Sequence, residues 1–160
     1  MKKISNNQNG FTLVEVLVVL VLLTLSFMIF LNALNTGKTV RAKSELRTIQ
    51  STILNSIENQ IRSRRFDENL TEPWSITLGQ DTGESLVTEF DDIDDFDGYV
   101  IVQYPEHPAF RCDVSVNYVS ASTGFHVSQS DRSNYKSVMV KISHGTLPAM
   151  TDTMIIGSGL

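Results

Sequence analysis

Residues 10–34 read GFTLVEVLVVLVLLTLSFMIFLNAL, a nearly unbroken apolar run that contains one carboxylate, Glu15. At about 1.5 Å per residue, the 24 residues from Phe11 to Leu34 form roughly 36 Å of helix, and a membrane's hydrocarbon core is about 30 Å thick. The run is therefore predicted to be a membrane-spanning helix. Because a charge in hydrocarbon costs roughly 2.5–3.5 kcal/mol, Glu15 is a candidate functional residue.

The ten residues before the run, MKKISNNQNG, carry Lys2 and Lys3, no acidic residue, and a final Gly10. An ordinary secretory signal has a small-residue cleavage site after an apolar region of about 7–15 residues. Here the small residue comes before the apolar run, and the run is longer. Any cleavage is therefore predicted on the cytoplasmic side of the hydrophobic segment.

These N-terminal residues resemble the class III signal of type IV pilins and type II secretion pseudopilins, over about residues 1–35. The resemblance implies that a prepilin peptidase cuts after Gly10 and methylates the new amino terminus of Phe11. It also implies that Glu15 is the glutamate that accompanies such a cleavage site. The implied partners are the peptidase, other pilin subunits, the inner membrane and its assembly platform.

The physical chemistry of Glu15 agrees with this resemblance. A subunit that leaves the bilayer for a filament keeps its apolar helix buried among neighbouring helices, where an unpaired carboxylate is strongly destabilising. Pairing with the terminal ammonium of a neighbouring Phe11 would offset that penalty. We therefore predict that Glu15 sets the axial register of assembly. The alternative is that Glu15 reaches the lipid headgroups and has no role in assembly.

The positive charges that flank the apolar run conflict with this topology. Lys2 and Lys3 precede the run, and a larger basic group follows it: Lys38, Arg41, Lys43 and Arg47. The positive-inside rule alone would place the C-terminal part in the cytoplasm. Because the cleavage motif is more specific, we predict instead an inner-membrane subunit with a periplasmic head.

The remaining sequence predicts one α+β head domain. Apolar residues continue at helical spacing after the span, and no proline occurs between residues 11 and 65, which predicts one long helix whose second half is amphipathic. The expected division is a leader at 1–10, a transmembrane and assembly helix at 11–35, and a pilin-like head at 36–160. Ile49, Ile53 and Ile57 are the residues expected to face the sheet.

After residue 65 the pattern changes to short runs of period two that are separated by turn residues. We expect these runs to form an antiparallel sheet with one buried face. The predicted strands are residues 74–78, 85–90, 99–104, 112–119, 125–128, 137–143 and 153–156.

The head also contains a run of aspartates, Asp91, Asp92, Asp94, Asp95 and Asp97. Clustered carboxylates repel one another unless water or a hard cation such as Ca²⁺ lies between them. The spacing does not fit an EF-hand loop. The default expectation is an exposed acidic loop or a contact surface for basic partners, with a calcium site as the alternative. Residues 90–99, FDDIDDFDGY, also resemble a stretch of minor pilins from the mannose-sensitive haemagglutinin type pilus.

Other features narrow the class of function. Cys112 is the single cysteine, so no intrachain disulfide forms, and it is expected to be a buried strand residue. The formal net charge is −5, and loss of Lys2 and Lys3 takes it to −7, so nucleic acid is not an expected partner. No catalytic motif is present, which predicts that the chain is not an enzyme.

The sequence analysis therefore predicts a minor pilin-like structural subunit that needs no cofactor. Two alternatives remain open. One is a type II secretion pseudopilin, which the same residues would serve. The other is a single-pass membrane-anchored periplasmic binding protein in which Glu15 has no role.

Overall fold

The computed structural model describes residues 10–159. The predicted leader, apart from Gly10, therefore lies outside the described residues. Helix α1 runs from Leu13 to Arg62, close to the predicted helix. The chain divides between Ser44 and Glu45 into two compact units, which are described separately below. The predicted boundary at residues 35 and 36 lies within α1.

The first unit is the N-terminal part of α1, which is helical through Gly37 without a break. Glycine inside a helix costs about 1 kcal/mol relative to alanine, and α1 continues through Gly37 in spite of that cost. None of the described side chains up to Ser44 is buried. This part of the helix therefore presents its whole circumference to the surroundings.

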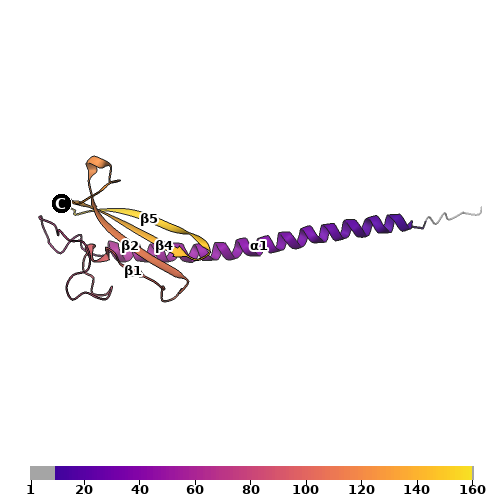
Figure 1. The fold of residues 1–160 in the computed structure, drawn as a ribbon, viewed down its shortest axis with the longest axis horizontal. Coiled ribbons are helices and arrows are strands. Elements are labelled where there is room, and N and C mark those ends of the chain that lie inside the picture. The colour runs from indigo at the N-terminus through magenta and orange to yellow at the C-terminus, as the bar shows by residue number, and fades with distance from the viewer. Residues whose placement is uncertain (1–9, 160) are drawn as a thin grey trace, which may run out of the picture. The chain divides into compact units, whose positions relative to one another are not determined.

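The second unit contains the end of α1 and a five-stranded antiparallel sheet (Figure 1). The order is β1-β2-β4-β5, and β3 pairs with β2 outside this path. The strands are β1 (Val100–Ile101), β2 (Phe110–Val119), β3 (Ser128–Gln129), β4 (Tyr135–His144) and β5 (Leu147–Gly157). Two single-turn 3-10 helices complete the fold, η1 (Asp94–Phe96) and η2 (Ala121–Thr123). The predicted α+β class is confirmed.

The central strands follow the predicted alternation. Val114 lies opposite Val140 and Val116 lies opposite Val138, and all four side chains are buried on the same face of the sheet. Cross-strand pairs of this kind stabilise antiparallel sheets because β-branched side chains pack well on the pleated surface. Cys112 is buried on β2, as predicted.

The predicted strands at 74–78 and 85–90 are wrong, because both segments are irregular loop. In the second segment, the backbone N–H groups of Ser85 and Leu86 each donate to Glu89 Oε2 at 2.8 Å. This side chain takes the place of a neighbouring strand. The predicted strand at 99–104 is also shortened to two residues, because a tight turn follows in which Tyr104 pairs with His107.

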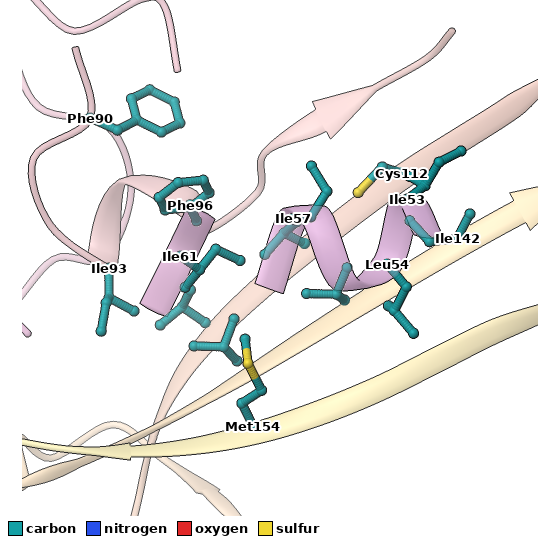
Figure 2. Close-up of a cluster of buried hydrophobic side chains, with 14 of the residues drawn as sticks. Ile53, Leu54, Ile57, Ile61, Phe90, Ile93, Phe96, Cys112, Ile142 and Met154 are labelled. Carbon is teal, nitrogen blue, oxygen red and sulfur yellow. The ribbon is translucent and has the colours of Figure 1, made fainter. Parts of the chain in front are cut away.

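The hydrophobic core lies between the last turns of α1 and the sheet (Figure 2). Ile53, Leu54, Ile57 and Ile61 are buried on the helix and face the apolar side chains of β2 and β4. Ile49 is partly buried at the edge of this cluster. The predicted helix face is therefore confirmed, and it extends by one further turn to Ile61.

Candidate functional site: the N-terminal segment and the acidic loop

The first candidate site is the start of α1. Thr12 precedes the helix, and its Oγ1 accepts a hydrogen bond from the backbone N–H of Glu15 at 3.3 Å. Its carbonyl oxygen accepts the first helical hydrogen bond, from Val16 N–H at 3.2 Å. This is an N-cap, and Thr12-x-x-Glu15 has the spacing of a capping box. The sequence analysis missed this role of Thr12, although the spacing was visible.

Capping gives Glu15 a local role as well as its predicted one. A carboxylate in the first turn interacts favourably with the positive end of the helix dipole. That effect is worth about 0.3–1 kcal/mol in exposed positions, which is less than the cost of placing the charge in hydrocarbon. Capping alone therefore does not account for an acid in this segment.

The predicted cleavage position lies just outside the helix. Gly10 is exposed, Phe11 is 82% exposed, and neither residue is helical. A Cβ added at Gly10 would meet nothing within 4 Å of this chain. Any requirement for glycine at this position would therefore come from the processing enzyme and not from the fold of the subunit.

The apolar surface of α1 is the largest feature of the first unit. Large hydrophobic side chains from Leu13 to Leu34 are between 44% and 80% exposed. Monomeric soluble proteins rarely expose contiguous apolar patches above a few hundred Å². Among the described residues, α1 is the one helix long and apolar enough to cross a membrane. This surface requires a lipid or protein environment to cover it.

The hydroxyl groups in the apolar run of α1 are compatible with a lipid or protein environment. Thr24 Oγ1 donates to the carbonyl of Val21, and Ser26 Oγ donates to the carbonyl of Leu22, both at 2.8 Å. A polar group that is hydrogen-bonded within its own helix carries a much smaller transfer penalty than an unpaired one. Glu15 is therefore the residue of the run whose charge still needs a partner.

The second candidate site is the acidic loop, residues 89–97. The expectation that this loop is exposed and solvated is wrong for its central aspartates, because Asp92, Asp94 and Asp95 are only 1–3% exposed. Asp92 Oδ1 accepts the N–H groups of Asp94 and Asp95, at 2.7 and 3.4 Å. Asp95 Oδ2 accepts those of Asp91 and Asp92, at 2.9 and 3.1 Å. The carboxylates therefore hold the loop and η1 together from inside.

The aromatic residues of the same stretch form a compact cluster. The ring centroid of Phe90 lies 5.1 Å from that of Phe96 and 5.4 Å from that of Tyr99, in edge-to-face arrangements. Gly98 has a φ of 72°, a left-handed conformation that glycine adopts without strain, and it turns the chain from η1 into β1. The FDDIDDFDGY stretch is thus a folded element of the core.

The five aspartates proposed as calcium ligands have separate partners. Asp91 pairs with Arg65, Asp94 pairs with Lys136, and Asp97 Oδ1 accepts the N–H of Val116 at 2.8 Å. Of the five, only Asp95 belongs to a group of carboxylate oxygens within 4.8 Å of one another, together with Asp81 and Glu84. Calcium binding by the loop stays a prediction.

A buried charge cluster links the acidic loop to the sheet. The Lys136 side chain on β4 is 0% exposed. Its Nζ donates to Asp67 Oδ2 at 3.0 Å, to Asp94 Oδ1, and to the Phe66 carbonyl at 2.6 Å. The ring centroids of Phe66 and Tyr118 lie 4.3 and 5.2 Å from Nζ. One cation therefore lies between two carboxylates within an aromatic enclosure.

The two carboxylates of this cluster differ electrostatically. Burial would raise the pKa of Asp67, but hydrogen bonds from the Ser75 backbone and from Lys136 outweigh it and hold the pKa below its ordinary value. Burial raises the pKa of Asp94 to about 7, even though Lys136 acts in the opposite direction. Asp94 Oδ2 is buried without a hydrogen-bond partner. Asp67 is therefore the buried carboxylate of the pair that is well supplied with hydrogen-bond donors.

The sequence analysis missed Lys136, although a signal was present. Lys136 has the same parity on β4 as Val138, Val140 and Ile142, all of which are buried. The period-two pattern therefore places Lys136 on the inner face of the sheet. A lysine at such a position requires a buried counter-charge, which is a stronger indication than the lysine alone.

Comparison with known protein families gives one result. The prokaryotic N-terminal methylation motif, which is the class III prepilin signal of type IV pilins, matches residues 5–31. No curated protein and no solved structure is significantly similar to the chain. The motif and the exposed apolar helix support a type IV pilin-like or pseudopilin subunit.

Proposed function

We propose that this chain is a minor type IV pilin-like structural subunit. It is inserted in the bacterial inner membrane with its head in the periplasm, cut after Gly10 by prepilin peptidase, and methylated at Phe11. The apolar part of α1 then leaves the bilayer and packs among the helices of other pilin subunits at the assembly platform. The observation that carries the proposal is the methylation motif at the start of a helix whose apolar side chains are exposed all round.

The choice of a minor pilin rests on finer features. The chain has a single cysteine, which is buried, so the described head has no disulfide-closed loop. The FDDIDDFDGY stretch resembles minor pilins of the mannose-sensitive haemagglutinin type pilus, and in this structure it forms part of the core. Its sequence therefore reflects the head fold more than a contact surface. A type II secretion pseudopilin is the alternative within the same class.

A structural role also agrees with the chemistry of the head. Burial raises the pKa of the Cys112 thiol to about 12, so this cysteine is not a reactive nucleophile at neutral pH. Three of the buried acids, Asp67, Asp92 and Asp95, accept hydrogen bonds from backbone N–H groups. These contacts stabilise the loops, and we propose that the chain acts by assembly and not by catalysis.

Mass spectrometry of the N-terminus tests this proposal. The chain isolated from its native membranes is expected to begin at N-methylated Phe11, and a Gly10→Val variant is expected to keep Met1. An intact Met1 in the working wild-type protein would overturn the proposal and favour a membrane-anchored binding protein. If the chain begins at Phe11 as expected, the proteins that cross-link to this mature chain distinguish a pilus from a secretion pseudopilus.

A further inference from the structure

The buried cluster around Lys136 contains the groups required for a covalent link between two side chains. Asp94 Oδ1 accepts a hydrogen bond from Lys136 Nζ, and Asp94 Oδ2 has no partner. Among the described residues, Lys136 is thus the one side chain that stabilises the Asp94 carboxyl. The two residues are 42 positions apart, on η1 and on β4.

Asp67, to which Lys136 Nζ also donates, is held by several other donors. Its Oδ1 accepts the Ser75 hydroxyl at 2.9 Å and the Asn69 N–H at 3.0 Å, and its Oδ2 accepts the Ser75 N–H at 3.0 Å. Tyr118 Oη, which donates to the Ser75 carbonyl at 2.8 Å, also lies 3.3 Å from Oδ2. These donors hold the Asp67 carboxyl in place next to the Lys136 amine, and this is the position of a proton carrier.

We propose that Lys136 and Asp94 condense to an intramolecular amide, with Asp67 carrying the proton. Asp67 takes a proton from the Lys136 ammonium and passes it to the Asp94 carboxylate, and the neutral amine attacks Cγ of the resulting carboxyl. The C–N bond forms, Asp67 takes a second proton from the nitrogen and gives it to the departing hydroxyl, and one C–O bond breaks as that hydroxyl leaves as water. The ammonium and the carboxylate become one amide and one water, and no oxidant or reductant is consumed.

Burial favours this condensation in two ways. Two groups fixed in contact react with effective molarities of about 10⁵–10⁸ M, which offsets the unfavourable equilibrium of amide formation in water. The reaction also replaces a buried cation and a buried anion with a neutral amide, so it removes two desolvation penalties from the interior. The proposal does not depend on pilus assembly, because every group belongs to one head.

The intact mass of the full-length chain, purified in detergent and denatured, tests the link. The expected mass is about 18 Da below that of the unlinked sequence with the same N-terminus. Proteolysis is expected to release a branched peptide that joins the Asp94 and Lys136 segments. The single cysteine simplifies the measurement, since no intrachain disulfide changes the mass. A wild-type chain at the unlinked mass, with both residues in linear peptides, would overturn the proposal and leave an ion triad.

Three variants assign the roles. Lys136→Arg keeps the cation, and this variant is expected to have the mass of its own unlinked sequence. Asp94→Asn is expected to lose about 17 Da, as ammonia, because the same carbonyl carbon is attacked. Asp67→Asn keeps both reacting groups and is expected to remain unlinked. A link to residue 67 in the branched peptide, or an unchanged link in Asp67→Asn, would contradict the assigned roles.

Discussion

At the residue scale, Asp92 shows how burial changes the function of an acidic side chain. Burial, together with the nearby charge of Asp95, raises the pKa of Asp92 to about 6. Its Oδ1 meanwhile accepts two backbone N–H groups at the start of η1. The side chain thus serves the fold as a hydrogen-bond acceptor, and its negative charge opposes folding.

This raised pKa predicts a pH dependence of stability. The folded state binds the Asp92 proton more tightly than the unfolded chain does, because the pKa of this carboxyl in the unfolded chain is near 3.8. The contribution to stability is therefore present below pH 3.8 and is lost as the pH rises through about 6. Asp92→Asn keeps the Oδ1 acceptor, so we expect it to be more stable than wild type at pH 7, by on the order of 2 kcal/mol.

Thermal unfolding of the full chain in detergent, at pH 4 and at pH 7, measures this difference. The gain from Asp92→Asn is expected to disappear at pH 4, where the wild-type aspartate is protonated. Asp131→Asn, at an exposed position in the loop before β4, is the matched control and is expected to change little at either pH. Equal gains at both pH values would show that the charge of Asp92 is not the cause.

Glu15 gives a second prediction at this scale. Glu15→Gln removes the charge but keeps a good helix former, so we expect normal processing and at least a tenfold loss of incorporation into filaments, about 1.4 kcal/mol or more. Thr12→Val is the control, because it removes the N-cap and keeps the carboxylate. Immunoblots of sheared filament and membrane fractions provide the measurement. Equal losses in both variants would assign Glu15 to capping alone.

At the element scale, the second half of α1 is held by its contacts with the sheet. Ile57 is 3% exposed and lies in the middle of the buried helix face. Truncating a buried isoleucine to alanine removes its transfer free energy and leaves a cavity, so Ile57→Ala is expected to cost about 2–5 kcal/mol. Ile76→Ala, at a loop position that is 77% exposed, is expected to change stability by less than about 0.5 kcal/mol.

Denaturant unfolding of the full-length chain in detergent compares these two isoleucine variants. The expected result is a lower midpoint for Ile57→Ala with wild-type behaviour for Ile76→Ala. A small effect at Ile57 would mean that the helix and the sheet do not share one core. The contrast also tests the corrected assignment of residues 74–78, since an isoleucine on a buried strand face would not tolerate the change.

At the scale of the whole molecule, the charges around the span and the cleavage motif predict opposite topologies. Four basic residues follow the span between positions 38 and 47, and two precede it. We expect the motif to prevail, because the proposed processing requires insertion with Gly10 on the cytoplasmic side. Protease added to spheroplasts is then expected to degrade the head while a cytoplasmic marker stays intact. A head that is protected until the cells are lysed would contradict this topology.

Much of the architecture could be predicted because it depends on local patterns. The apolar run, the absence of proline and the helical spacing of isoleucines defined α1 and its buried face. The alternation of Val114 and Val116, and of Val138 and Val140, defined the two central strands. Each of these patterns lies within one element, so the periodicity of the backbone is enough to interpret it.

The loop between α1 and β1 could not be predicted in the same way. Period-two spacing suggested strands at 74–78 and 85–90, but no neighbouring strand is available there, and side chains such as Glu89 satisfy the backbone instead. The aspartate run was expected to be exposed because like charges repel. Its burial depends on backbone N–H donors and on Lys136, which the fold brings from other parts of the chain.

The sequence by itself determined the membrane-compatible helix, the processing motif and the central strands, because local spacing and hydrophobicity encode them. Only the tertiary structure decided where the charged groups lie. Whether Asp94 is a solvated surface acid or a buried partner of Lys136 depends on contacts between residues 42 positions apart. The energy of a charge depends on what surrounds it, and its surroundings exist only after the chain has folded.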